Sequence, residues 1–71
     1  MPLVNQLKVY RAKLGINQGE LGKKAGVSRQ TISLIERGDY NPSITLALTL
    51  AKIFQVSVEV LFSLEEDQNE G

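Results

Sequence analysis

Two short helical segments joined by a glycine turn constrain the fold of this chain more than any other feature. Residues 17–38 read NQGELGKKAGVSRQTISLIERG. Asn17 suits the N-cap of the first segment, Glu20 stands at the capping-box position, and Gly26 can end the helix. Because only about three residues separate the two segments, the helices must cross steeply. A steep crossing needs a small residue at the contact, and Gly22 can supply it.

The second segment has two different faces. Ser28 is a good N-cap, and Gly38 tolerates the left-handed conformation that ends many helices. At about 100° per residue, Ile32 and Ile35 share one side with Thr31 at its edge, and this side can be buried. The opposite, outer side carries Arg29, Gln30, Ser33, Leu34 and Arg37.

An outer face of this composition can read base edges in the major groove of DNA. Arg pairs with guanine and Gln with adenine, each through two hydrogen bonds. Leu34 can touch only an apolar group, such as a thymine methyl. We therefore assign base contacts to Arg29, Gln30, Ser33 and Leu34. The alternative is an ordinary amphipathic helix with a solvated polar face, and this helix alone favours neither interpretation.

Turn, cap and core positions along the chain agree in register with one known family. The matching residues are Gln18, Glu20, Leu21, Gly26, Val27, Ser28, Ile32, Ile35, Glu36, Gly38, Asn41, Pro42, Ser43, Val56, Ser57, Leu61 and Phe62. Over residues 3–63 the chain thus resembles the Cro/repressor-type helix-turn-helix regulators of the xenobiotic-response-element kind. The resemblance implies an all-α fold: a compact five-helix DNA-binding domain with the helix-turn-helix at helices 2 and 3. It also implies binding to operator DNA as a dimer.

The remaining apolar spacing predicts three scaffold helices. They are expected over residues 3–14, over residues 44–54 after an N-cap at Ser43, and in a short segment capped by Ser57. Their inward side chains should be Leu3, Leu7, Tyr10, Leu14, Ile44, Ala47, Leu50, Ala51, Phe54, Leu61 and Phe62. Gln55 stands where the resembled family usually has glycine, so either a strained Gln55 or a different cap geometry is expected there.

Length and composition limit the classes of function. The 71 residues suffice for one small domain, which we expect over residues 1–63, followed by a disordered acidic tail over residues 64–71. The absence of Cys and His excludes disulfides, thiolate metal sites and imidazole catalysis. No apolar run approaches the roughly 20 residues that span a membrane, and the N-terminus lacks a signal-peptide pattern. We therefore expect no enzyme activity, cofactor, metal or small-molecule ligand.

The charges are unevenly distributed, although the net charge is zero. Residues 1–40 hold seven basic and three acidic side chains, a net charge of +4. Residues 41–71 hold one basic and five acidic side chains, a net charge of −4. A basic half and an acidic half suit a protein with one DNA-facing side. The alternative is chance asymmetry combined with a solubilising tail.

Phosphate contacts should surround the base-reading helix. The resemblance assigns them to Asn17, Gln18, Ser28, Arg37, Asn41 and Ser43. Thr31 is expected to pack or to contact phosphate rather than to read a base. Gln18 also stands at the start of a helix, where the amide groups attract phosphate. Helix capping explains Asn17, Ser28 and Ser43 equally well, and turn formation is the simpler explanation of Asn41.

An ion pair between two helices is also expected. In the resembled family, an arginine of the first helix pairs with a glutamate near the end of the base-reading helix. Arg11 and Glu36 stand at the matching positions. Glu36 lies at the rim of the buried side, where an unpaired carboxylate would be unfavourable. Two independent surface charges are the alternative.

Apolar residues left over after the core is filled indicate a dimer interface. They are Leu46, Ile53, Val58, Val60 and Leu64. A two-fold dimer would present two reading helices about 34 Å apart, which matches one turn of DNA. Scattered surface valines are the alternative.

These features together predict a cytoplasmic, sequence-specific transcriptional regulator. We expect it to be a repressor that reads a palindromic operator in double-stranded DNA as a homodimer. One alternative is an antitoxin or phage-type switch component that binds both DNA and a protein partner. Another is a protein-interaction module that kept the helical fold but lost DNA binding.

Overall fold

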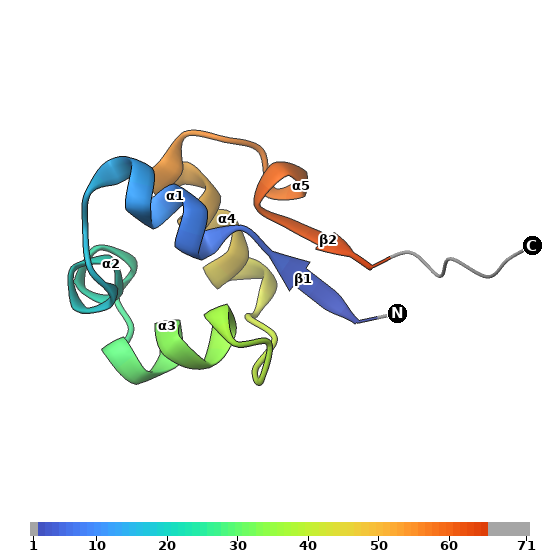
Figure 1. Cartoon of the computed structure of the whole chain (residues 1–71), viewed down its shortest axis with the longest axis horizontal. Helices are drawn as coiled ribbons and strands as arrows, with labels where there is room; N and C mark the ends of the chain where they lie inside the picture. The colour runs from blue at the N-terminus through green and yellow to red at the C-terminus, as the bar shows by residue number, and fades with distance from the viewer. Residues whose placement is uncertain (1, 66–71) are drawn as a thin grey trace, which may run out of the picture.

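Five helices and a small two-stranded sheet form the part of the chain that the computed structural model describes, residues 2–65 (Figure 1). The elements are β1 (Leu3–Asn5), α1 (Leu7–Leu14), α2 (Gln18–Ala25), α3 (Arg29–Glu36), α4 (Ile44–Phe54), α5 (Val58–Leu61) and β2 (Phe62–Leu64). The five expected helices are confirmed, and the sheet is an addition to the expected all-α fold.

Every helix contributes to a single hydrophobic core. The fully buried large side chains are Leu7, Leu21, Ile32, Ile35, Leu50 and Leu61. Ala51 and Phe62 are buried beside them. Most of these helices have only eight residues or fewer, a length that is marginal in isolation. Their stability must therefore come from packing against one another.

The N-terminal segment differs from the sequence prediction. The first helix begins at Leu7 rather than Leu3, because residues 3–5 form β1 and pair antiparallel with β2. Leu3 lies opposite Leu64, and Asn5 lies opposite Phe62. Figure 1 shows the two strands side by side, away from α2. Helical spacing of apolar residues cannot reveal a partner strand at the other end of the chain.

The folded structure also crosses the expected domain boundary. β2 continues to Leu64, so the boundary after residue 63 and the placement of Leu64 in a disordered tail are wrong. Residues 66–71 of the expected tail lie outside the described part of the chain. Within the described part, no helix combines the length and apolar content needed to cross a bilayer.

Two of the expected inward side chains point outward instead. Leu14 is 49% exposed and Ile44 is 76% exposed. Leu14 is the last residue of α1, and Ile44 is the first residue of α4, so neither lies where its helix meets the core. The other expected inward residues of α4 pack in or against the core: Ala47, Leu50, Ala51 and Phe54.

Candidate nucleic-acid interface

The unit formed by α2 and α3 is fixed by side-chain caps. The Asn17 side chain accepts a hydrogen bond from the Glu20 amide at 2.8 Å, and the Glu20 carboxylate accepts one from the Asn17 amide at 2.8 Å. At α3, Ser28 Oγ accepts a hydrogen bond from the Thr31 amide at 3.1 Å. The caps expected for α2 and α3 are therefore confirmed, whereas Ser57, the expected cap of α5, makes no side-chain hydrogen bond to its helix.

The steep crossing of α2 and α3 depends on Gly22. A Cβ atom added at this position would lie 2.7 Å from the carbonyl oxygen of Val27 and 3.2 Å from the backbone of Ser28. The distance of 2.7 Å is shorter than real Cβ contacts, and 3.2 Å is tighter than most of them, so only glycine allows the turn to lie this close to α2. Gly22 is fully packed in this contact, as the sequence predicts.

The outer face of α3 is open. Arg29, Gln30 and Arg37 are exposed, and Ser33 and Leu34 are half-buried. A shallow recess of about 290 Å³ is lined by Gln30, Ser33, Leu34 and Arg37. These residues follow one another at helical spacing, so their side chains form one continuous surface along α3. The buried face of the same helix carries Ile32 and Ile35.

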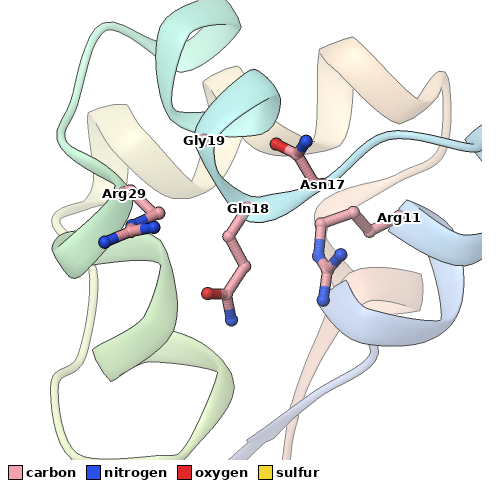
Figure 2. A pocket seen from close by; sticks show the side chains of 5 residues that line it. All are labelled: Arg11, Asn17, Gln18, Gly19 and Arg29. Carbon is pink, nitrogen blue, oxygen red and sulfur yellow. The ribbon is translucent and has the colours of Figure 1, made fainter.

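A second recess lies between α1, α2 and the start of α3. It has a volume of about 460 Å³ and is lined by Arg11, Asn17, Gln18, Gly19 and Arg29. In Figure 2 the amide of Gln18 lies between the side chains of Arg11 and Arg29. Arg29 is exposed, whereas Arg11 is half-buried. The recess therefore combines an exposed guanidinium group with the N-terminus of α2, an arrangement that attracts anions.

The expected Arg11–Glu36 ion pair is present in the structure. Arg11 Nε lies 2.7 Å from Glu36 Oε2, and Arg11 Nη2 donates to Glu36 Oε1 at 3.2 Å. Gln18 Nε2 donates to the same Oε1 at 3.0 Å, and Arg11 Nη1 donates to the carbonyl of Ile16 at 3.2 Å. The side chain of Glu36 is only 6% exposed. One carboxylate on α3 thus connects α3 to α1 and α2.

The electrostatics of Glu36 follow from these contacts. Burial by itself raises the pKa of the Glu36 carboxyl, but the hydrogen bonds from Arg11 and Gln18 and the charge of Arg11 outweigh burial. The pKa of Glu36 therefore lies below its ordinary value. The hydrogen bond to Glu36 raises the pKa of Arg11 in turn. The pair is fully charged near neutral pH, as an ion pair between helices requires.

Comparison with known proteins decides the family. A family model described as Helix-turn-helix matches residues 7–61, which is well over half of the chain. The chain belongs to the helix-turn-helix family. It is a DNA-binding transcriptional regulator with a repressor-like fold, and regulators of this family are not enzymes.

Similar proteins include both curated relatives and solved structures. An uncharacterized HTH-type transcriptional regulator of Methanocaldococcus jannaschii is 52% identical over 64 residues, which cover 90% of this chain and 97% of the relative. The P22 c2 repressor protein in complex with synthetic operator 9T superposes with a TM-score of 0.73 at 39% identity, covering 76% of this chain and 82% of that one. The N-terminal DNA binding domain of SinR from Bacillus subtilis also gives a TM-score of 0.73, at 37% identity, covering 90% and 91%.

In this helix-turn-helix regulator, the residues assigned to phosphate lie around α3. Asn17, Ser28 and Ser43 all cap helices, and the Ser43 Oγ accepts the Leu46 amide at 3.1 Å. Asn41 is exposed in the α3–α4 loop. The capping role of the three residues is therefore present in the structure. Their contact with phosphate stays a prediction, as do the base contacts.

The structure adds two contacts that the sequence analysis does not contain. Arg37 Nε lies 3.4 Å from Asp39 Oδ2 in an exposed ion pair. Asn5 Nδ2 donates to the carbonyl of Ile35 at 2.9 Å, across 30 residues of sequence. The opposite charges of Arg37 and Asp39, two residues apart, could have indicated their ion pair. No feature of the sequence near Asn5 indicates its hydrogen bond to Ile35.

The five residues expected at a dimer interface separate into two groups. Leu46, Ile53 and Val58 are half-buried and pack against the core of their own domain, so they are not left over from core formation. Val60 is 47% exposed and Leu64 is 55% exposed. Of the five residues, only Val60 and Leu64 are thus exposed apolar side chains of the kind that the dimer prediction requires.

Proposed function

We propose that this helix-turn-helix regulator is a repressor that reads a palindromic operator through the major groove as a homodimer. The observation that carries the proposal is the outer face of α3. There, Gln30, Ser33, Leu34 and Arg37 line one open recess, while Ile32 and Ile35 anchor the opposite face in the core. A helix held in this way can present amide, hydroxyl and guanidinium groups to base edges.

Comparison with solved structures supports the same proposal. The P22 c2 repressor, which was solved with a synthetic operator, has a similar fold. A closed two-fold dimer presents two identical reading helices, so its preferred site should be a palindrome. We propose that the protein acts in the cytoplasm, where such an operator would be accessible.

Selection of bound sites from random double-stranded DNA tests the proposal. We expect enrichment of an inverted repeat whose half-sites are separated by about one helical turn, roughly 10.5 base pairs. Affinity should fall steeply as salt increases, because phosphate contacts release counterions. Failure to enrich any sequence, with the protein verified as folded, would remove the proposal. Enrichment of a single half-site would remove only the dimer.

The assignment of base contacts is tested within the same selection. Arg29→Ala should relax the preference at one position in each half-site, with a loss of about 1–3 kcal/mol of discrimination there. Gln18→Ala should instead weaken all sites alike, because the proposed contact of Gln18 is with phosphate and its amide also holds Glu36 of α3. Lys52→Ala removes the same charge as Arg29→Ala from α4, outside the expected interface, and should leave the preferences unchanged. If Arg29→Ala and the parent protein select the same bases at every position, the proposed base contact of Arg29 is contradicted.

A further inference from the structure

The last turn of α3 is held from three sides by polar contacts. Glu36 is bound by Arg11 of α1 and Gln18 of α2. The preceding residue, Ile35, is held through its carbonyl oxygen by Asn5 of β1. β1 lies beside the end of α3 that leads into the α3–α4 loop (Figure 1). Two consecutive residues of the reading helix are thus connected to three other elements.

Asn5 uses both ends of its side-chain amide. Nδ2 donates to the Ile35 carbonyl at 2.9 Å, and Oδ1 accepts from the Leu7 amide at 3.1 Å, at the start of α1. The backbone beside it is fixed as well, because the Gln6 amide donates to the carbonyl of Leu61 at 2.9 Å. Asn5 therefore belongs to a framework in which both ends of the described chain meet.

The Ile35 carbonyl is also part of the turn that ends α3. It accepts the Gly38 amide at 3.0 Å, while the Leu34 carbonyl accepts the Asp39 amide at 2.9 Å. With Gly38 at φ +82°, this pair of bonds is a Schellman motif. The chain leaves this motif directly into the loop that carries Asn41. A shift of the Ile35 carbonyl would therefore move both the reading helix and the loop.

We infer that Asn5 is a positioning residue for DNA recognition: its amide connects the terminal sheet to the end of α3 and sets the orientation of the reading helix. This inference rests on the proposed DNA contacts of α3. Side chains that bind must be held by a supporting layer to within about half an ångström. An eight-residue helix has too few bonds of its own to do so, because short helices are marginal alone.

The test separates the donor of Asn5 from its acceptor. Asn5→Asp keeps an oxygen for the Leu7 amide but removes the donor to Ile35. Ser63→Asp adds the same charge to the exposed side of β2 and is the matched control, because Ser63 is exposed and opposite Val4. We expect Asn5→Asp to weaken binding to the selected operator by about fivefold to tenfold, the loss expected for one ordering hydrogen bond. Discrimination against an operator with one altered base should fall as well, and Ser63→Asp should leave both nearly unchanged.

Amide hydrogen exchange gives a readout that does not depend on DNA. In Asn5→Asp, the amides of Gly38 and Asp39 should exchange about tenfold faster, while that of Leu50 in α4 keeps its protection. If the parent protein binds no DNA, the proposed function fails and exchange alone decides whether Asn5 positions α3. If Asn5→Asp does not fold, Asn5→Ser replaces it, because its hydroxyl can accept from Leu7 but is too short to reach Ile35.

Two results would overturn the inference. One is a variant that only melts at lower temperature, with operator affinity, base discrimination and exchange at Gly38 and Asp39 all unchanged in the folded protein. The other is an equal loss in Asn5→Asp and Ser63→Asp, which would assign the effect to charge. A selective loss in Asn5→Asp, with faster exchange at the end of α3, supports it.

Discussion

At the scale of single residues, the carboxylate of Glu36 connects three helices. It receives hydrogen bonds from Arg11 of α1 and Gln18 of α2 while it stands on α3. The side chains of Glu36 and Arg11 are only 6% and 16% exposed. When one partner of such a pair is removed, the other charge stays largely out of water, which costs more than breaking a surface pair.

Glu36→Gln should therefore destabilise the domain. The loss of the charged partner for Arg11 should lower the free energy of unfolding by about 2 kcal/mol. In a domain of this size, the melting temperature would fall by roughly 10 °C. Asp39→Asn is the control, because its ion pair with Arg37 is exposed and should contribute little. Circular dichroism melts measure both, and an unchanged melting temperature for Glu36→Gln would refute a stabilising role for the pair.

The same residue predicts how stability depends on pH. Because the pKa of Glu36 is lowered in the folded protein, the pair stabilises the fold fully above the ordinary carboxyl pKa of about 4.3. This stabilisation disappears as the pH falls through the lowered pKa of the folded state. Glu36→Gln has no carboxylate at this position and therefore does not lose this stabilisation in acid. The difference in melting temperature between Glu36→Gln and the parent protein should consequently shrink at low pH. Equal differences at neutral pH and in strong acid would contradict the lowered pKa.

At the scale of elements, the contact between α2 and α3 depends on the size of one residue. Gly22→Ala places a Cβ atom 2.7 Å from the Val27 carbonyl oxygen, which belongs to the backbone and cannot rotate away. The two helices must separate, and we expect a loss of about 1–3 kcal/mol of stability, the usual cost of overpacking. Operator affinity should fall as well, because α3 is displaced.

Gly19→Ala is the matched control in the same helix. Its nearest neighbours would be Asn17 Oδ1 at 3.4 Å and Arg29 Cδ at 3.9 Å, which are ordinary contacts. Since alanine favours a helix over glycine by about 1 kcal/mol, this variant should be equally stable or more stable. Chemical denaturation compares the two variants. A destabilised Gly19→Ala together with a stable Gly22→Ala would reverse the assigned roles.

Sequence reasoning succeeded where the determining interactions are local. The caps at Asn17 and Ser28 and the close approach at Gly22 each depend on residues within one or two turns, and all are present. Of the two alternatives for Gln55, the structure has the left-handed backbone in place of a different cap, since this residue ends α4 at φ 60°. Helix periodicity likewise separated the buried and open faces of α3 correctly.

Sequence reasoning failed where the interaction that determines the structure is with a residue far away in the sequence. β1 exists because residues 3–5 pair with residues 62–64, and a helical spacing of leucines competes with that pairing in any local reading. Asn5 reaches Ile35 only after the chain has folded. The composition of the outer face of α3 was thus predictable, but the side chain that holds the end of this helix was not.

At the scale of the whole molecule, a chain with no net charge can still offer DNA one basic side. Residues 1–40, which carry a net charge of +4, form β1 and α1 to α3. The acidic residues are concentrated in the remainder of the chain. We expect this division of charge along the sequence to favour attraction of DNA to the helices that carry the proposed contacts. The salt dependence of binding should report that attraction rather than the net charge.

The proposed dimer is the other property of the whole molecule, and its candidate interface lies at exposed apolar side chains near the C-terminal end of the described fold. Val60 on α5 is 47% exposed, and Leu64 on β2 is 55% exposed. Val9 on α1 has almost the same exposure as Val60, at 46%, but lies outside the proposed interface. The two valines therefore form a matched pair for testing where a second copy binds.

Val60→Lys should shift the protein from dimer to monomer in sedimentation experiments, because a lysine would have to be desolvated at the interface. Val9→Lys should leave assembly unchanged. An added positive charge by itself strengthens attraction to DNA, so weaker operator binding by a folded Val60→Lys, with Val9→Lys unaffected, would indicate lost assembly. We expect that loss to appear for the full palindrome and to be absent for an isolated half-site, which one subunit can occupy. If both variants stay dimeric and bind the palindrome equally, the second copy must contact another surface of the domain.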